Sequence, residues 1–247
     1  MKALLVVIAA AMIVATLVAT FAPASLVDAR LATATGGYVR VAEADGTLWR
    51  GRGVVGASDG RWRVPVAWSL DFAPLLRGTV AATLWSEATP EERSLLTVSQ
   101  GRFVVESLDV TLPGAVLAVI DPAAGVATGG ELRLRATSLE LAPSSSSGTI
   151  TADWSNARAQ LGAFRIDLGT VTLRLASQNG GLGGPLANTG GDVNLEGSVT
   201  LRDRRLDAQL RVAPNANAPP GLRNALASLG PADARGAVAI RIGRALR

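Results

Sequence analysis

The chain has 247 residues and a formal net charge of +4, and it contains neither histidine nor cysteine. Without these side chains it has no Ser–His or Cys–His nucleophile, no disulfide and none of the commonest zinc ligands. Its basic residues are scattered, and no basic stripe interleaved with aromatic residues indicates nucleic-acid binding. We therefore predict a protein that is not an enzyme, needs no cofactor or metal and binds no nucleic acid.

The first element is an uncharged apolar run over residues 3–22. About 20 apolar residues in a helix, at roughly 1.5 Å each, cross a hydrocarbon core of about 30 Å. We therefore assign residues 1–25 to a single transmembrane anchor, with a short cytoplasmic N-terminus and the bulk of the chain on the other side. The large side chains of this anchor are Leu4, Leu5, Val6, Val7, Ile8, Met12, Ile13, Val14, Leu17, Val18 and Phe21.

A cleaved signal peptide is the alternative interpretation of the same segment. Ala22-Pro23-Ala24 has small residues at the spacing of a cleavage site. The apolar stretch of a signal peptide is usually about 7–15 residues long, however, and this run is longer. Its length favours a retained anchor.

Residues 26–247 are patterned as a β-rich domain. Apolar residues alternate with polar ones along residues 62–70, 131–137, 192–202 and 206–212, which is typical of half-buried strands. Trp62 and Trp68 occupy apolar positions of the first run, so we expect them in the core. A short turn near residues 203–205 joins the last two runs into an antiparallel hairpin.

In two other segments the alternation changes phase partway. Phe103 and Val105 give way to Leu108 and Val110, and a similar change crosses Gly169 within residues 166–175. A slip of one residue turns side chains to the opposite face unless a bulge absorbs it. We therefore expect long strands with bulges in a curved, mostly antiparallel sheet, half-barrel or groove-like in form.

Helix is scarce outside the anchor, with one or two short helices expected. Residues 113–120 are apolar and predict a short buried helix, and residues 219–229 predict a second one with Leu222 and Leu226 on one face. The serine run at residues 144–147 predicts a flexible loop. This loop separates two candidate halves of the domain, over about residues 36–142 and 148–247.

A Gly-Thr-aliphatic triplet begins at each of four glycines. These are Gly46, Gly78, Gly148 and Gly169. Glycine suits a turn and threonine suits the start of a strand. Turn chemistry accounts for the recurrence as well as an internal duplication does.

The segment Gly46-Thr47-Leu48-Trp49-Arg50-Gly51-Arg52-Gly53, soon after a single span, resembles the type II secretion system protein N family. Members of that family have a short cytoplasmic tail, one inner-membrane helix and a periplasmic β-rich domain that opens on a G-[ST]-L-W-x-G segment. Residues 148–154 and 161–162 resemble a mid-domain tryptophan segment, and residues 210–214, 222–230 and 236 onward resemble the end of the family's domain. The candidate motif or interface residues are Gly46, Leu48, Trp49, Gly51 and Trp154.

This resemblance implies a part in the secretion of folded proteins from the periplasm across the outer membrane. It also implies a bacterial inner-membrane location, with other type II secretion components and the bilayer as partners. The family supplies no catalytic residues. A distant likeness to AsmA-type proteins leaves an anchored lipid-binding or lipid-transfer domain as the alternative, because an apolar face of a curved sheet can seat a lipid or an extended peptide.

Overall fold

The computed structural model describes residues 22–86, 93–119, 127–142, 145–161, 164–203, 205–216, 218–219, 221–227, 230–234 and 236–245. Residues 1–21 of the predicted anchor, which was assigned to residues 1–25, lie outside these ranges. Within the ranges, no helix is both long enough and apolar enough to cross a membrane. The described chain is mainly β and antiparallel, and it divides into two compact units, Met1–Glu91 and Glu92–Arg247.

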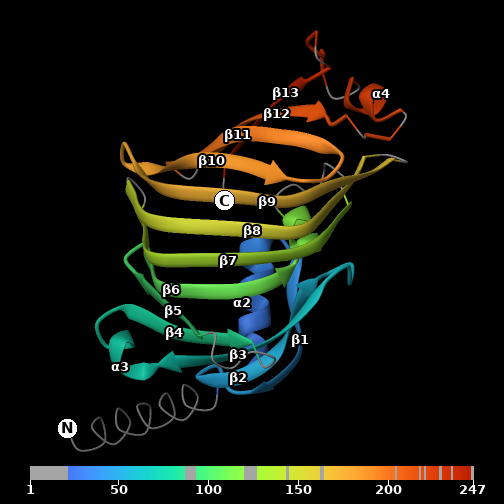
Figure 1. Cartoon of the computed structure of the whole chain (residues 1–247). Coiled ribbons are helices and arrows are strands. Elements are labelled where there is room, and N and C mark those ends of the chain that lie inside the picture. Colours follow the sequence, from blue (N-terminus) through green and yellow to red (C-terminus); the bar gives the residue numbers. More distant parts are fainter. Residues whose placement is uncertain are drawn as a thin grey trace, which may run out of the picture. The chain divides into compact units, whose positions relative to one another are not determined.

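Unit 1 has four strands in sequence order, each antiparallel to the next. Its elements are α2 (Ser25–Thr35), β1 (Val39–Gly46), β2 (Arg50–Ala57), β3 (Arg63–Asp71), α3 (Phe72–Leu75) and β4 (Thr79–Ser86), coloured blue to teal in Figure 1. Trp62 and Trp68 are both buried, as predicted.

Unit 2 continues the pattern with nine strands, β5 to β13, again ordered as in the sequence. Its elements are β5 (Arg93–Ser99), β6 (Arg102–Pro113), a 3-10 helix η1 (Gly114–Val119), β7 (Ala127–Ala142), β8 (Ser145–Leu161), β9 (Phe164–Gln178), β10 (Gly181–Thr189), β11 (Val193–Arg202), β12 (Arg205–Pro214), α4 (Leu222–Ala227) and β13 (Val238–Ala245). Figure 1 shows the long strands β7, β8 and β9 bowed along their length. Residues 142 and 148, where two halves were expected to part, lie in the neighbouring strands β7 and β8 of this unit.

Tight turns explain the antiparallel order. Between β5 and β6, Gln100 and Gly101 have φ angles of 47° and 78°, and between β9 and β10, Asn179 and Gly180 have 50° and 78°. Two consecutive residues with positive φ match the type I′ turn, whose twist suits a two-residue hairpin. The predicted β11–β12 hairpin is confirmed, with Val193 opposite Pro214 and Arg202 opposite Arg205.

The phase changes in the sequence correspond to β-bulges. Leu95 and Leu96 of β5 lie opposite Ser107 and Val105 of β6, so β6 carries one extra residue there. The β8–β9 register also shifts on both sides of the pair formed by Ala157 and Gly169. These shifts let Ile166 and Val171, an odd number of residues apart, both be buried.

Within the helix predicted over residues 219–229, residues 222–227 form α4. The short buried helix predicted over residues 113–120 forms as the 3-10 helix η1, and its residues 115–118 are half-buried. Leu222 and Leu226 of α4 pack against strand residues in one core cluster of unit 2. Its other buried members are Ala157, Ile166, Val171, Val193, Leu195, Val212 and Val238.

The helices α2 and α3 were not predicted from the sequence. None of the residues of α2 is buried, so α2 shows no apolar stripe that periodicity could reveal. Instead, the Asp28 carboxylate accepts hydrogen bonds from the Val41 N–H, at 2.8 Å, and from the Arg40 guanidinium, at 2.6 and 2.9 Å. Polar contacts with β1 therefore hold this helix.

Candidate functional site at the β1–β2 turn

Four of the five candidate residues lie together in the turn between β1 and β2. Gly46 and Gly51 are paired across the two strands, and residues 47–49 form the loop that leads into β2 at Arg50. The Thr47 N–H donates to the Arg50 carbonyl at 3.0 Å, and the Arg50 N–H donates to the Thr47 hydroxyl at 3.2 Å. The G-T-L-W-R-G segment is therefore one closed structural unit.

Steric crowding explains why both of these positions in the segment are glycine. Gly46 has a φ of 89°, and a Cβ there would lie 2.6 Å from the Arg50 carbonyl oxygen. A Cβ on Gly51 would lie 2.6 Å from Cζ2 of Trp68 and 2.8 Å from the Thr47 carbonyl oxygen. The turn thus closes only with glycine at these two positions.

Trp68 holds this turn from the neighbouring strand. It lies directly opposite Gly51 in the β2–β3 register, its side chain is buried, and its Nε1–H donates to the Leu48 carbonyl at 3.1 Å. The sequence indicated a core role for Trp68 but not this contact. Only the register of β2 against β3 brings the indole to the turn.

Trp49 differs from Trp68 in being only half-buried. Its ring meets the Phe72 ring edge-on, with centroids 5.5 Å apart, and its carbonyl accepts from the Leu70 N–H at 2.7 Å. Phe72 is itself 58 % exposed, and Leu76, at the end of α3, is 78 % exposed. The sequence analysis did not predict a functional role for Phe72 and Leu76. The local pattern that could have indicated one is their spacing of four residues directly after a strand.

The segment that follows the predicted anchor ends at the same turn. The Leu48 N–H donates to the Ala22 carbonyl at 2.7 Å, and the Ala24 N–H lies 3.4 Å from the Gly46 carbonyl oxygen. Pro23 forms an isolated antiparallel bridge with Thr47. Residues 22–24 are therefore hydrogen-bonded to the turn of the motif.

Trp154, the fifth candidate, lies in unit 2 and serves a different local structure. Its Nε1–H donates to the Gly129 carbonyl at 2.8 Å, and a Cβ on Gly114 would lie 2.6 Å from that nitrogen. The Thr128 hydroxyl donates to the Gly114 carbonyl at 2.8 Å. Trp154 thus packs where η1 meets β7 and β8.

The carboxylates whose pKa values are lowered accept hydrogen bonds from arginines or from backbone N–H groups. Hydrogen bonds from Arg40 and Val41 lower the pKa of Asp28 to about 2. A hydrogen bond from Arg133, 2.7 Å away, lowers the pKa of Asp109 on unit 2. Such carboxylates stay ionised at neutral pH, which suits ion pairing and does not suit a general acid.

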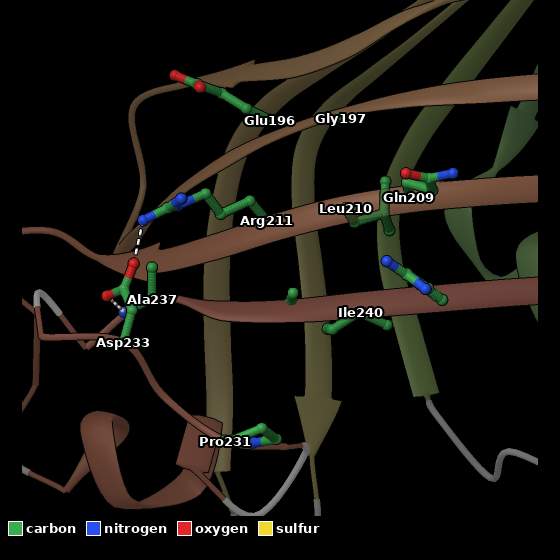
Figure 2. A pocket seen from close by; sticks show the side chains of 11 residues that line it. Glu196, Gly197, Gln209, Leu210, Arg211, Pro231, Asp233, Ala237 and Ile240 are labelled. Atoms are coloured by element: carbon green, nitrogen blue, oxygen red, sulfur yellow. Dashed lines mark hydrogen bonds and ion pairs between the residues drawn. The ribbon is translucent and has the colours of Figure 1, made fainter.

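Unit 2 also has a groove of about 650 Å³ over β11, β12 and β13, shown in Figure 2. Arg211 and Asp233 form an ion pair at its wall. The full lining is Glu196, Gly197, Gln209, Leu210, Arg211, Pro231, Asp233, Ala237, Ala239, Ile240 and Arg241. Charged and amide side chains lie in this lining beside leucine, isoleucine, proline and alanine, so the groove offers both polar and apolar surface.

Fold and site together define an antiparallel β-sheet protein with a closed glycine–tryptophan turn and a partly exposed aromatic pair beside it. Residues 38–241 match the family "Type II secretion system (T2SS), protein N". The chain belongs to this family, as the resemblance of the turn segment indicated. The family is a secretion-system component, which gives the chain a role in type II secretion and protein transport. Comparison with curated proteins and with solved structures gave no match, and nothing in the comparisons supports the AsmA-like alternative.

Proposed function

We propose that this protein is a non-enzymatic inner-membrane component of the type II secretion system. The observation that carries the proposal is the family match over residues 38–241, which includes the β1–β2 turn and most strands of both units. In this proposal residues 3–22 span the membrane, the N-terminus is cytoplasmic and both units are periplasmic. The protein then contributes to the secretion of folded proteins through contacts with other components of the machinery.

A groove-like or half-barrel curvature of unit 2 belongs to the same proposal. The bowed strands in Figure 1 and the bulges of β6, β8 and β9 support it. An extended peptide on the groove over β11–β13 belongs to the same proposal, because polar side chains such as Gln209 and Arg211 line the groove together with apolar ones such as Leu210.

Deletion of the gene in its own host tests the role in secretion. A folded secreted enzyme should then accumulate in the periplasm and fall in the medium, and a plasmid copy of the gene should restore its release. Undiminished secretion in the deletion strain, with the other components expressed normally, would refute the proposal.

Topology is tested separately. Alkaline phosphatase fused after Arg247 should be active, and the full-length protein should resist carbonate extraction. A shortened, carbonate-soluble periplasmic product would instead show that the N-terminal segment is cleaved.

A further inference from the structure

One end of unit 1 carries a partly exposed apolar cluster, here called the apolar tip, in which Phe72 and Leu76 are exposed and Trp49 and Leu75 are half-buried. Phe72 and Leu76 lie four residues apart in helical backbone, so they share a face of α3. Phe72 also contacts the ring of Trp49. Exposed large apolar side chains that gather in one place indicate a contact surface.

The strand register places the members of the tip at one end of the unit. Arg50, at the start of β2, pairs with Ser69, near the end of β3, so the β1–β2 turn and α3 lie at the same end. Ser58, in the β2–β3 turn, lies at the opposite end. Eight residues of β2 separate the two ends, a distance of roughly 25 Å at about 3.3 Å per residue.

The apolar run of residues 3–22 joins the fold at the tip end. The Ala22 carbonyl accepts from the Leu48 N–H, directly before Trp49. From there α2 leads toward the other end, where the Val39 N–H donates to the Thr35 hydroxyl at 3.1 Å. A span over residues 3–22 would therefore emerge from the bilayer next to the tip.

The charges around the tip suit a membrane surface. Arg50 and Arg77 are both exposed, and neither forms an ion pair with another described residue. Asp71 is an exposed acid in the same region. Tryptophan prefers the membrane–water interface, and arginine near the surface is attracted to anionic head groups.

We propose that the apolar tip inserts into the interfacial region of the bilayer that residues 3–22 cross, with Arg50 and Arg77 at anionic phospholipid head groups. This inference rests on the membrane anchoring proposed above. Insertion would fix the orientation of unit 1 against the membrane by a second contact beside the span. A single span leaves the attached domain free to rotate, whereas two contacts restrain it.

The test uses the absence of native cysteine in the full-length chain. Ala73→Cys, on the exposed side of α3, and Ser58→Cys, at the far end of unit 1, each receive an environment-sensitive nitrobenzoxadiazole label. The labelled proteins are reconstituted into vesicles of phosphatidylethanolamine and phosphatidylglycerol. A doxyl-labelled phospholipid should quench the label at residue 73, and its emission should be blue-shifted, whereas aqueous iodide should quench the label at residue 58.

A second set of variants separates tip insertion from mere closeness to the membrane. Adding Phe72→Ser and Leu76→Ser to the Ala73→Cys protein should abolish the lipid quenching. Adding Val98→Ser, at a 39 % exposed apolar residue of unit 2, should leave it unchanged. Replacing phosphatidylglycerol by phosphatidylcholine should weaken the quenching.

Two outcomes would overturn the inference. If the protein floats with the vesicles but the label at residue 73 stays exposed to water, the tip does not insert, although the anchor does. This result would indicate that the tip binds a protein partner instead of the bilayer. A protein that does not float with the vesicles rules out both anchor and insertion. The secretion assay with the deletion strain is independent of either result.

Discussion

At the scale of single residues, the Gly46–Gly51 segment is explained by contacts within one turn. Gly46 supplies a positive φ, Gly51 leaves room for the Trp68 ring, and the Leu48 carbonyl accepts from the Trp68 indole. These roles concern the shape of the turn. Trp49 also contacts the exposed Phe72 ring, which lies outside the turn.

Gly51→Ala tests the steric role of this glycine. Its new Cβ would lie within 3 Å of Trp68 and of two backbone oxygens, so we expect a loss of about 1–3 kcal/mol in the free energy of unfolding. Gly129→Ala is the control, because a Cβ there has no neighbour closer than 3.9 Å. Thermal unfolding followed by circular dichroism should show a lower midpoint for Gly51→Ala only, and equal midpoints would contradict the account of the turn.

Trp49 and Trp68 should respond differently to truncation. Trp68→Ala empties a buried site and should cost about 3–5 kcal/mol of stability. Trp49→Ala should cost less than Trp68→Ala, because Trp49 is only half-buried, and about 0.5–1.5 kcal/mol of that cost comes from the edge contact with Phe72. The two unfolding midpoints and the steady-state protein level are the measurements. If Trp49→Ala loses secretion while folding normally, Trp49 marks an interface, and if it unfolds as readily as Trp68→Ala, its role is structural.

At the scale of elements, α2 shows how a helix can dock without an apolar face. Its contact with β1 depends on the Asp28 carboxylate, which binds a guanidinium and a backbone N–H at once. Charge-assisted hydrogen bonds of this kind are stronger than neutral ones. The helix ends at Thr35, followed by Gly36 with a left-handed φ of 64°, and the Gly37 N–H donates back to the Ala32 carbonyl.

Asp28→Asn should weaken this docking and change its pH dependence. The folded-state pKa of Asp28 is lowered to about 2, below the usual value near 3.9, so its stabilisation is fully present above about pH 4 and is lost as the pH falls toward 2. The wild type should therefore lose stability over this window by more than Asp28→Asn does. Acid titration of the unfolding midpoint measures the difference.

Asp45→Asn is the matched control for this titration. Asp45 forms an ion pair with Arg52 in which both side chains are more than 60 % exposed, so its removal should change stability little. A similar acid profile for Asp28→Asn and the wild type would argue against the docking role of Asp28.

At the scale of the whole molecule, strands dominate both units. Helix in the described residues is confined to α2, α3, α4 and the 3-10 turns of η1. The far-ultraviolet circular dichroism spectrum of the full-length protein should therefore be mainly β, even with an anchor helix added. A helix content above about one third, the usual share in globular proteins, would contradict this architecture.

Some features of this architecture follow from local sequence signals. The alternation along residues 192–202 and 206–212 and the turn at Asp203 predicted the β11–β12 hairpin correctly. Leu222 and Leu226 predicted the buried face of α4. The helix α2 could not be predicted in the same way, because its docking depends on Arg40 and Val41 of a later strand.

By itself, the sequence determined the β class, the antiparallel hairpins, the bulges and the resemblance to the family. These depend on period-two alternation, turn residues and short motifs, which are properties of neighbours along the chain. Only the tertiary structure decided that Gly51 faces Trp68, that residues 22–24 bind the β1–β2 turn, and that Phe72 and Leu76 are exposed beside Trp49. Those contacts depend on strand register, where a slip of one residue turns every side chain to the opposite face.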